Sequence, residues 1–486
     1  MEQIELNNMT HDEFNDKPLC VDLDGTLIKT DSIIETLLIA IKKSPVLILL
    51  LPFWLLKGKN YFKNRIVKYG IPDVSIFPYN NEVIELIKKA KSQGRTTVLS
   101  TATKEEIATA VGNHTQLFDE VICSTDTFNN RSSNKAEVLI NKFGVKGFDY
   151  IGNGYSDIAV FEKADKSILI SDNKHLIRKV TALNSNLDIL KTDKNNFKYL
   201  LKGMRFYQWT KNVLIFLPLI LAHAFTDNKF IFDTLVGFLC FSFTASFIYL
   251  VNDLMDLESD RRHTTKSRRP FASGNLSPVL SLSVSFAFLV ISIIISFTYL
   301  PTEFGLILIS YLILTISYSV YLKKITILDI ITLSILYSIR IIAGSAITNI
   351  ALSKWFLAFS LFLFFSLAII KRYTELSNLL KQNQTKTIGR GYQTDDMTIL
   401  LSMGTSSGYL SVLIFLFYIF SPDVIKLYRE PVLLMPVSII LLFWITRMWF
   451  LARRGEMNED PLVFTSKDKY SYLMLLIAVV FIFIAI

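Results

Sequence analysis

The chain has 486 residues, of which 51% are hydrophobic, and its mean hydropathy is +0.39. That apolar fraction is too high for an ordinary soluble protein, and it excludes intrinsic disorder, a collagen-like repeat and a small disulfide scaffold. The three cysteines lie far apart and provide neither a disulfide framework nor a zinc-ligand spacing, so we expect buried thiols in a reducing compartment.

The net charge of +9 is carried almost entirely by the second part of the chain. Residues 1–200 hold 26 lysines and arginines against 25 acidic residues, whereas residues 201–486 hold 25 against 17. Because the basic excess lies in the apolar part, it indicates membrane topology rather than nucleic-acid binding. The first part lacks a basic stripe with interleaved aromatic residues, so we expect no nucleic-acid partner.

Residues 1–195 alternate short apolar strands with helical stretches, which predicts a cytoplasmic α/β domain with a parallel sheet. The acidic and polar start, residues 1–14, lacks the features of a secretory signal. The segment 44–56 is apolar, but its 13 residues include two prolines and are too few to cross a bilayer. It predicts either a cap helix packed on the domain or a segment resting on the membrane surface.

Residues 196–204 form the expected linker, and residues 205–486 the expected all-α polytopic membrane domain. Apolar segments long enough to cross a bilayer recur along this second part. We predict nine transmembrane helices, near 209–225, 230–251, 278–298, 304–322, 327–349, 354–371, 397–419, 431–452 and 470–486.

The loops between these segments differ sharply in charge. The loops 252–277, 323–326, 371–396 and 453–469 carry 16 lysines and arginines, and the opposite set carries four. By the positive-inside rule, we expect the first set of loops and the α/β domain to lie in the cytoplasm. The chain would then be a multi-pass protein of the inner membrane. Nine crossings would then leave the C-terminus outside.

The sharpest motif in the first part is Asp22-Leu-Asp24-Gly-Thr-Leu, which follows an apolar strand. This places two carboxylates on one loop at the carboxyl edge of a sheet, where α/β folds bind ligands. One aspartate can attack phosphorus while the other passes a proton to the leaving oxygen, and Mg²⁺ would neutralise the crowded anions.

This pattern resembles the haloacid-dehalogenase phosphatases. The resemblance implies that Thr101, at the end of a strand, and Lys135 bind the phosphoryl group, and that Asp22, Asp24, Asn153 and Asp157 surround the metal. The family typically has an acidic residue where this chain has Asn153. An asparagine can still coordinate Mg²⁺ through its carbonyl oxygen, but with one charge fewer the affinity should fall.

A second acidic motif, Asn252-Asp253-Leu-Met-Asp256-Leu-Glu-Ser-Asp260, lies at the cytoplasmic end of the second membrane segment. On one continuous helix its four polar side chains would fit within an arc of about 100°. Such a cluster repels itself unless a divalent cation neutralises it, and Mg²⁺ with a diphosphate is the natural occupant.

The motif resembles the first aspartate-rich motif of the UbiA superfamily of intramembrane prenyltransferases, which have nine helices. The basic turn 266–274 and the segment 318–329 match further motifs of that superfamily. The resemblance implies substrate-binding roles for Arg268, Arg269, Tyr318, Lys323 and Lys324, and a second metal-binding role for Asp329.

Three further features refine this resemblance. Two arginines, Arg340 and Arg447, lie inside predicted membrane segments, where charge is costly and usually marks a site. The segments around Lys211-Asn212 and Lys371-Arg372 look like the decaprenyl-phosphate phosphoribosyltransferase branch. We therefore expect these four residues and Arg340 to bind the phosphates of donor and acceptor.

The branch resemblance implies transfer of 5-phosphoribose from phosphoribosyl diphosphate (PRPP) to a polyprenyl phosphate, with Mg²⁺ as cofactor. The fused phosphatase would then remove the 5-phosphate, and the resulting polyprenyl-phosphoryl ribose would serve cell-wall glycan synthesis. Two alternatives stay open: an aromatic, quinone-type prenyltransferase with an attached phosphatase, and a transporter or scaffold with a regulatory domain.

Overall fold

The computed structural model describes residues 16–192, 196–383, 385, 387, 390–457 and 460–486, so the acidic start at residues 1–14 lies outside the described part. The chain divides into two compact units. The first comprises Met1–Gly203 with Asp253–Ser281, and the second comprises Met204–Asn252 with Leu282–Ile486. The chain therefore passes from one unit to the other three times.

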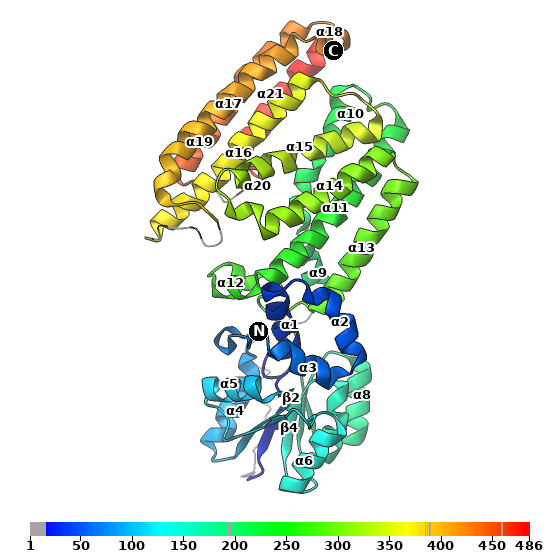
Figure 1. Ribbon diagram of the computed structural model, residues 1–486, viewed down its shortest axis with the longest axis vertical. Coiled ribbons are helices and arrows are strands. Elements are labelled where there is room, and N and C mark those ends of the chain that lie inside the picture. Colours follow the sequence, from blue (N-terminus) through cyan, green and yellow to red (C-terminus); the bar gives the residue numbers. More distant parts are fainter. Residues whose placement is uncertain (1–15, 193–195, 384, 386, 388–389, 458–459) are drawn as a thin grey trace, which may run out of the picture. The chain divides into compact units, whose positions relative to one another are not determined.

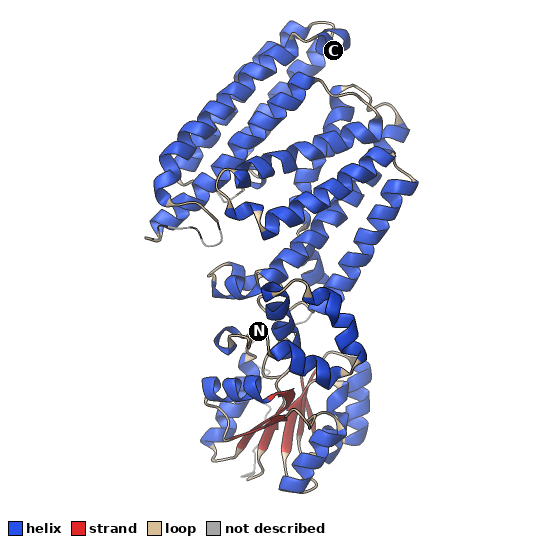
Figure 2. Cartoon of the chain, viewed as in Figure 1, coloured by secondary structure: helices blue, strands red, loops and turns tan. Residues whose placement is uncertain are grey.

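The first unit contains a six-stranded sheet in which every neighbouring pair is parallel, in the order β3-β2-β1-β4-β5-β6 (Figure 2). The strands are β1 (Leu19–Val21), β2 (Thr97–Lys104), β3 (Glu120–Ser124), β4 (Asp149–Gly152), β5 (Ser167–Ile170) and β6 (Leu187–Leu190). Because β1 lies between β2 and β4, the loops that follow these three strands meet at one edge of the sheet. The predicted parallel α/β domain is confirmed.

Helices cover both faces of this sheet (Figure 1). Helices α4 (Asn81–Ser92) and α5 (Glu105–Thr115) pack on one face through Ile87, Ile107 and Val111. Helices α6 (Ser133–Phe143), α7 (Ile158–Lys163) and α8 (Lys174–Leu183) pack on the other face, where Leu139 and Phe161 are fully buried.

A small helical cap follows β1. It consists of α1 (Ser32–Lys43), α2 (Leu47–Leu56) and α3 (Lys59–Val67), which share a core that includes Leu47, Trp54 and Phe62. Helix α1 begins at Asp31, whose carboxylate accepts a hydrogen bond from the Ile33 backbone N–H at 2.8 Å. The segment 44–56 is thus helical and anchored in the cap, although most of its side chains are exposed.

The segment Asp253–Ser281 belongs to the first unit. Its helix α12 (Leu257–Arg262) lies against the cap, because Arg261 donates to both oxygens of Glu35 at 2.6 and 3.1 Å. Both side chains are almost fully buried, at 4% and 7% exposure. Arg262 adds a more exposed ion pair with Asp73 at 2.6 Å.

The second unit is helical, and the chain is an integral membrane protein. Within the described residues, seven helices are long and apolar enough to cross a membrane. They are α11 (Asn228–Met255), α13 (Pro278–Thr298), α14 (Thr302–Val320), α15 (Leu328–Thr348), α16 (Lys354–Lys381), α17 (Met397–Ile419) and α19 (Met435–Arg454).

The remaining two expected membrane segments differ from the expectation. The last one forms α21 (Lys469–Ala485), an apolar helix of 17 residues. The expectation of one continuous helix at 209–225 is wrong, since a 3₁₀ helix (Phe206–Phe216) is followed by the short α10 (Leu217–Leu221). Its polar residues Lys211 and Asn212 are buried in protein contacts instead of lying on an apolar spanning helix. The expected linker 196–204 forms α9 (Asn196–Met204).

Candidate active sites

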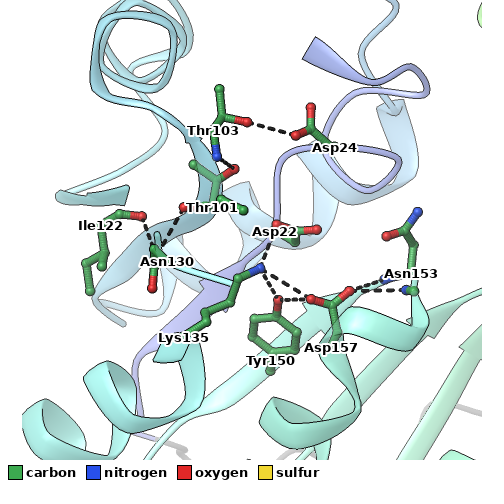
Figure 3. Close-up of polar contacts among 12 residues, drawn as sticks. Asp22, Asp24, Thr101, Thr103, Ile122, Asn130, Lys135, Tyr150, Asn153 and Asp157 are labelled. Carbon is green, nitrogen blue, oxygen red and sulfur yellow. Dashed lines mark hydrogen bonds and ion pairs between the residues drawn. The ribbon is translucent and has the colours of Figure 1, made fainter. Parts of the chain in front are cut away.

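The first candidate site lies at the carboxyl end of β1. Asp22 and Asp24 leave the strand on a turn that Gly25 makes possible, because its φ of +74° is the left-handed conformation. Figure 3 shows the two carboxylates near residues from β2, α6 and the loop after β4. The structure thus brings together the residues that the phosphatase resemblance selected.

Lys135 of α6 connects this site. Its buried ammonium donates to Asp22 Oδ1 at 2.8 Å, to Asp157 Oδ1 at 3.3 Å and to the Tyr150 hydroxyl at 3.0 Å. Tyr150 in turn donates to Asp157 Oδ1 at 2.9 Å, and the backbone N–H groups of Asn153 and Gly154 donate to Asp157 Oδ2. Asp157 therefore holds Lys135 in place, and Lys135 orients Asp22.

Asp24 is oriented from the cap and from β2. Its Oδ1 accepts from the Ser32 backbone N–H at 2.7 Å, and its Oδ2 accepts from the Thr103 hydroxyl at 2.8 Å. Thr101, which is fully buried, accepts from the Thr103 backbone N–H at 3.0 Å. The two aspartates thus have distinct surroundings: Asp22 faces an ammonium and Asp24 faces neutral donors.

Burial dominates the electrostatics of this site. It raises the pKa of Asp22 to about 7, although the Lys135 ammonium lowers it, and it raises the pKa of Asp24 to about 6, with Asp31 adding repulsion. Burial lowers the pKa of Lys135, but the attraction of Asp22 and Asp157 outweighs that effect and leaves the pKa above its usual range.

A cavity of about 460 Å³ opens onto these carboxylates. Asp22, Asp24 and Asn153 line it together with four cations: Lys59, Lys63, Arg131 and Lys135. Lys63 is held by a 2.7 Å hydrogen bond to the Ala102 carbonyl, directly after Thr101. Carboxylates at the base and cations along the wall suit a phosphomonoester that enters with its phosphate towards Asp22.

The residues around Asp22 fit a magnesium ion. Among the described residues, neither Asp22 Oδ2 nor the Asn153 side-chain amide has a hydrogen-bond partner, and both residues line the cavity. The Asn153 amide lies against the aspartate loop, because a Cβ added at Gly25 would come within 2.0 Å of its nitrogen. Oxygen donors beside a solvent-filled cavity suit Mg²⁺, which keeps several waters.

The second acidic motif is interrupted at Asp256. Helix α11 ends at Met255 and α12 begins at Leu257, so the motif does not lie on one continuous helix as the arc argument assumed. Asp253 and Asp260 nevertheless converge, since Nη1 of Arg269 donates to both, at 3.0 and 2.7 Å. Two carboxylates that share one cationic nitrogen form a pair that a divalent cation also fits.

In the second unit, Lys211, Lys371 and Arg340 form what we call the cationic centre. Lys211 and Lys371 both bind Asp460 Oδ2, at 2.5 and 3.2 Å. Burial raises the pKa of Asp460, but Lys371 and Lys211 outweigh that effect and hold the pKa below its usual range. The Lys211 ammonium also lies 5.8 Å from the centre of the Tyr337 ring.

Arg340 of α15 contacts the other side of this group. It is 4% exposed, its Nε donates to Asn212 Oδ1 at 2.8 Å, and its guanidinium lies 5.8 Å from the Tyr337 ring. Tyr311 contacts it in the same way, at 5.2 Å. No carboxylate among the described residues pairs with Arg340, so this buried charge is held by neutral groups and aromatic rings.

A third group in the second unit surrounds Asp329, which is completely buried. Arg372 donates to both of its oxygens, at 2.5 and 3.1 Å, and the Tyr318 hydroxyl donates at 2.7 Å. Glu375 then bridges Arg372 and Arg390. Both oxygens of Asp329 are thus occupied by protein donors.

The other expected residues lie on short 3₁₀ helices or at the end of α11. Lys323 and Lys324 lie in the segment Leu322–Lys324, and Arg268 lies in the segment Lys266–Arg268. Asn252 lies near the end of α11. For these four residues the structure shows which element each one lies on, but among the described residues it does not bring them together around one site.

Several residues of these groups were missed from the sequence. Tyr150 lies inside a strand and Tyr337 inside an apolar helix, so nothing distinguishes them from core residues. Asp460 lies 249 residues from Lys211, and its only signal is an Asp-Pro pair typical of a helix start. Glu375 had a signal, since it follows Arg372 at a helical spacing.

The chain matches the sequence profile of the UbiA prenyltransferase family over residues 213–484. It is 34% identical over 458 residues to the uncharacterized protein y4nM of Sinorhizobium fredii, covering 94% of this chain and 88% of that protein. It is 32% identical over 226 residues to the decaprenyl-phosphate phosphoribosyltransferase of Mycobacterium tuberculosis, covering 46% of this chain and 74% of that protein.

Two solved structures are similar to separate parts of the chain. A UbiA homolog from Archaeoglobus fulgidus bound to DMAPP and Mg²⁺ matches with a TM-score of 0.45 and 17% identity, covering 58% of this chain and 99% of that one. A phosphoserine phosphatase complex matches with a TM-score of 0.27 and 17% identity, covering 40% of this chain and 99% of that one.

Proposed function

Since the chain belongs to the UbiA prenyltransferase family, we propose that its membrane half transfers 5-phosphoribose from PRPP to a polyprenyl phosphate. The first unit then removes the 5-phosphate, as a phosphatase of the haloacid-dehalogenase type. The product of the two steps is a polyprenyl-phosphoryl ribose for cell-envelope glycan synthesis. The similarity to a decaprenyl-phosphate phosphoribosyltransferase supports the choice of substrates.

The observation that carries this proposal is the cationic centre. Lys211, Lys371 and Arg340 are gathered around Tyr337 and Asp460, and Arg340 lacks a carboxylate partner among the described residues. A buried guanidinium without an acidic partner favours an anionic ligand. Both alternatives bind a diphosphate donor, but phosphoribosyl transfer brings two more phosphates, one on the lipid acceptor and one on the ribose. Additional buried cations therefore favour phosphoribosyl transfer over the aromatic alternative.

In the transfer step, the bond between C1 of the ribose and the diphosphate oxygen breaks, and the diphosphate leaves with the electron pair. An oxygen of the polyprenyl phosphate then forms the new bond to C1. Asp253 and Asp260, which converge on Arg269, are the carboxylates that would hold the metal, with Asp256 as a further expected ligand. Asp329 does not fit this role, because Arg372 and Tyr318 occupy both of its oxygens. The metal would supply positive charge to the leaving diphosphate.

In the hydrolytic step, a carboxylate oxygen of Asp22 attacks phosphorus, and the bond to the ribose 5-oxygen breaks. Asp24 gives that oxygen its proton and later takes a proton from the water that releases phosphate. Lys135 orients Asp22, and Thr101 and Lys135 bind the phosphoryl oxygens. Asp22, Asp24, Asn153 and Asp157 would surround a magnesium ion, which would neutralise the phosphate oxygens.

In this proposal both steps take place on the cytoplasmic side of the inner membrane, and the basic charge of the loops supports that side. PRPP is water-soluble and anionic, so a site that faces the cytoplasm gives it direct access. The phosphatase unit would lie on the same side and meet the lipid-linked product at high effective concentration.

The test uses membranes that contain the chain, Mg²⁺, a polyprenyl phosphate and PRPP labelled on the ribose. Label should enter the lipid fraction, and the labelled ribose should lack its 5-phosphate. Asp256→Asn should abolish labelling, and Asp22→Asn should leave labelled lipid that retains the 5-phosphate. Labelling that persists in Asp256→Asn would refute the metal site. No labelling in the wild type would favour aromatic prenylation or transport.

A further inference from the structure

Helix α2 is apolar at every one of its ten positions, yet only Leu47 and Trp54 are buried. Leu49, Phe53 and Leu56 are 71%, 63% and 85% exposed. These fractions match that of Ile439, which is 68% exposed on the membrane-spanning helix α19. The exposed side chains form what we call the α2 patch: Val46, Ile48, Leu49, Leu50, Phe53, Leu55 and Leu56.

The α2 patch differs from the rest of the first unit. Elsewhere between residues 16 and 192, exposed large apolar side chains are scattered, as at Ile71, Val145 and Leu183. Single exposed apolar residues are normal on a soluble surface, whereas a contiguous apolar patch marks a contact with another apolar phase. The apolar phase that would cover the α2 patch can be identified from the surrounding charge.

Residues 36–72 contain seven lysines and arginines and no acidic residue. Lys42 and Lys43 precede α2, and Lys57 and Lys59 follow it, all four with exposed side chains. Arg65 of α3 contacts the faces of Trp54 and Tyr61. An apolar helix flanked by cations and aromatic rings is typical of a segment in the interface of an anionic bilayer.

The length of α2 determines how it can meet a bilayer. Ten helical residues extend about 15 Å, half the thickness of the hydrocarbon core, so α2 cannot span it. The first unit is also joined to the membrane-spanning unit at Gly203–Met204, Asn252–Asp253 and Ser281–Leu282. Because of these three covalent connections, the first unit cannot diffuse away from the membrane.

We propose that the α2 patch inserts into the interface of the membrane and thereby presents the mouth of the phosphatase cavity to phosphomonoesters carried on lipids. Leu55 of α2 lines the same cavity as Asp22, together with Lys59, Phe62 and Lys63 from the start of α3. One wall of the cavity is thus continuous with the α2 patch. A substrate whose lipid chain stays in the bilayer could present its phosphate to Asp22. This substrate class rests on the proposed phosphatase function, whereas the insertion of α2 does not.

Insertion is tested on the full chain in nanodiscs of phosphatidylcholine and phosphatidylglycerol, with Cys123 replaced by Ser because Cys20 and Cys240 are buried. An environment-sensitive fluorophore is attached to Leu49→Cys and, as a matched control, to Val145→Cys. Val145 is 63% exposed and lies in the loop between α6 and β4, at the edge of the sheet opposite Asp22.

Lipids with brominated acyl chains should quench the Leu49→Cys label roughly twofold and leave the Val145→Cys label unchanged. Equal quenching at both positions, or none at either, would overturn the proposal. Quenching that depends on a second labelled chain in the same disc, and not on bromine, would show that another copy covers the α2 patch and would also overturn it.

The substrate class is tested with Leu49→Asp combined with Phe53→Asp. The rate on soluble p-nitrophenyl phosphate should stay at the wild-type level, while the rate on lipid-borne phosphoribose should fall roughly tenfold or more. Equal rates on the lipid substrate would overturn this part. If the wild type hydrolyses neither substrate, the phosphatase function fails, and bromine quenching alone decides the insertion. If the double variant loses soluble activity, its cap is damaged, and quenching of Leu49→Cys again decides.

Discussion

Asp460→Asn should lower the stability of the membrane unit and at the same time raise its response to diphosphate. Asp460 Oδ2 binds Lys211 at 2.5 Å and Lys371 at 3.2 Å, so the two ammonium groups lie within about 6 Å of each other. The asparagine side chain has nearly the same shape and can still accept from the Leu462 and Val463 backbone N–H groups. The substitution therefore removes charge and leaves the start of α20 (Pro461–Thr465) intact.

The magnitude follows from that separation. Two like charges about 6 Å apart repel by about 3 kcal/mol at an effective dielectric constant near 20. In the wild type the attraction of Asp460 for both ammonium groups compensates this repulsion, and the substitution leaves it uncompensated. Lys211 is 8% exposed and Lys371 26% exposed, so solvent relieves part of this repulsion. We expect the free energy of unfolding to fall by about 2–3 kcal/mol, consistent with the loss of one partner from a largely buried ion pair.

The assay is thermal unfolding in one detergent, with and without inorganic diphosphate. Diphosphate should raise the Tm of Asp460→Asn more than that of the wild type, because it replaces the missing negative charge. Asp468→Asn is the matched control: Asp468 also begins a helix and binds Arg447 at 2.7 and 3.0 Å, but it bridges no second cation. A Tm loss no larger than that of Asp468→Asn, without an extra response to diphosphate, would refute the reasoning.

The ion pairs of Asp460 with Lys211 and Lys371 also predict how the stability of the membrane unit depends on pH. Because Lys371 and Lys211 hold the pKa of Asp460 below its usual range, its contribution to stability is present above the unfolded pKa. That contribution disappears only as the pH falls through the lower folded pKa. The Tm difference between wild type and Asp460→Asn should therefore be constant between about pH 5 and pH 9.

Two further substitutions test the other groups. Asn153→Asp adds a negative charge beside Asp22 at the cavity, so half-maximal phosphate release should need several-fold less Mg²⁺. The requirement is measured by titration of metal-stripped protein, and an unchanged requirement would exclude Asn153 from the metal site. Arg340→Gln should raise the KM for one phosphate-bearing substrate roughly 10- to 100-fold, because one charge-assisted hydrogen bond is lost. Arg340→Lys should recover part of the lost affinity. Wild-type kinetics in Arg340→Gln would make this charge purely structural.

The fold of the first unit and the grouping of residues around Asp22 were largely predictable because local signals and topology agree there. Asp22 lies directly after β1, Thr101 lies inside β2, three residues before its end, and Asp157 lies in the short 3₁₀ helix after β4. In a parallel sheet the carboxyl ends of these three strands meet at one edge. Lys135 could be chosen only through the family resemblance, since its position on α6 has no local signature. In the sequence, its partner Tyr150 looks like any other β-strand residue. Its contact with Lys135 follows only from the pairing of β4 with β1, which the sequence does not give.

The membrane half was less predictable for a physical reason. Hydropathy identifies apolar stretches, but it does not register whether a polar residue inside a stretch is satisfied by protein. Lys211 and Asn212 bind Asp460 and Arg340, and these contacts accompany a 3₁₀ helix where a spanning helix was expected. Similarly, the predicted arc of polar side chains around Asp256 required one regular helix. The sequence carries no signal for the break between α11 and α12 at Asp256.

The Arg261–Glu35 ion pair joins two parts of the first unit that lie on either side of a membrane helix in the sequence. The segment that carries Asp253 and Asp260 is inserted between two membrane helices in sequence, yet it is folded into the first unit. A protease that cut the chain between Gly203 and Met204 would therefore leave two fragments that still share a folded unit. Dividing the gene there would not give two independent proteins, because the second fragment would retain part of the first unit's structure.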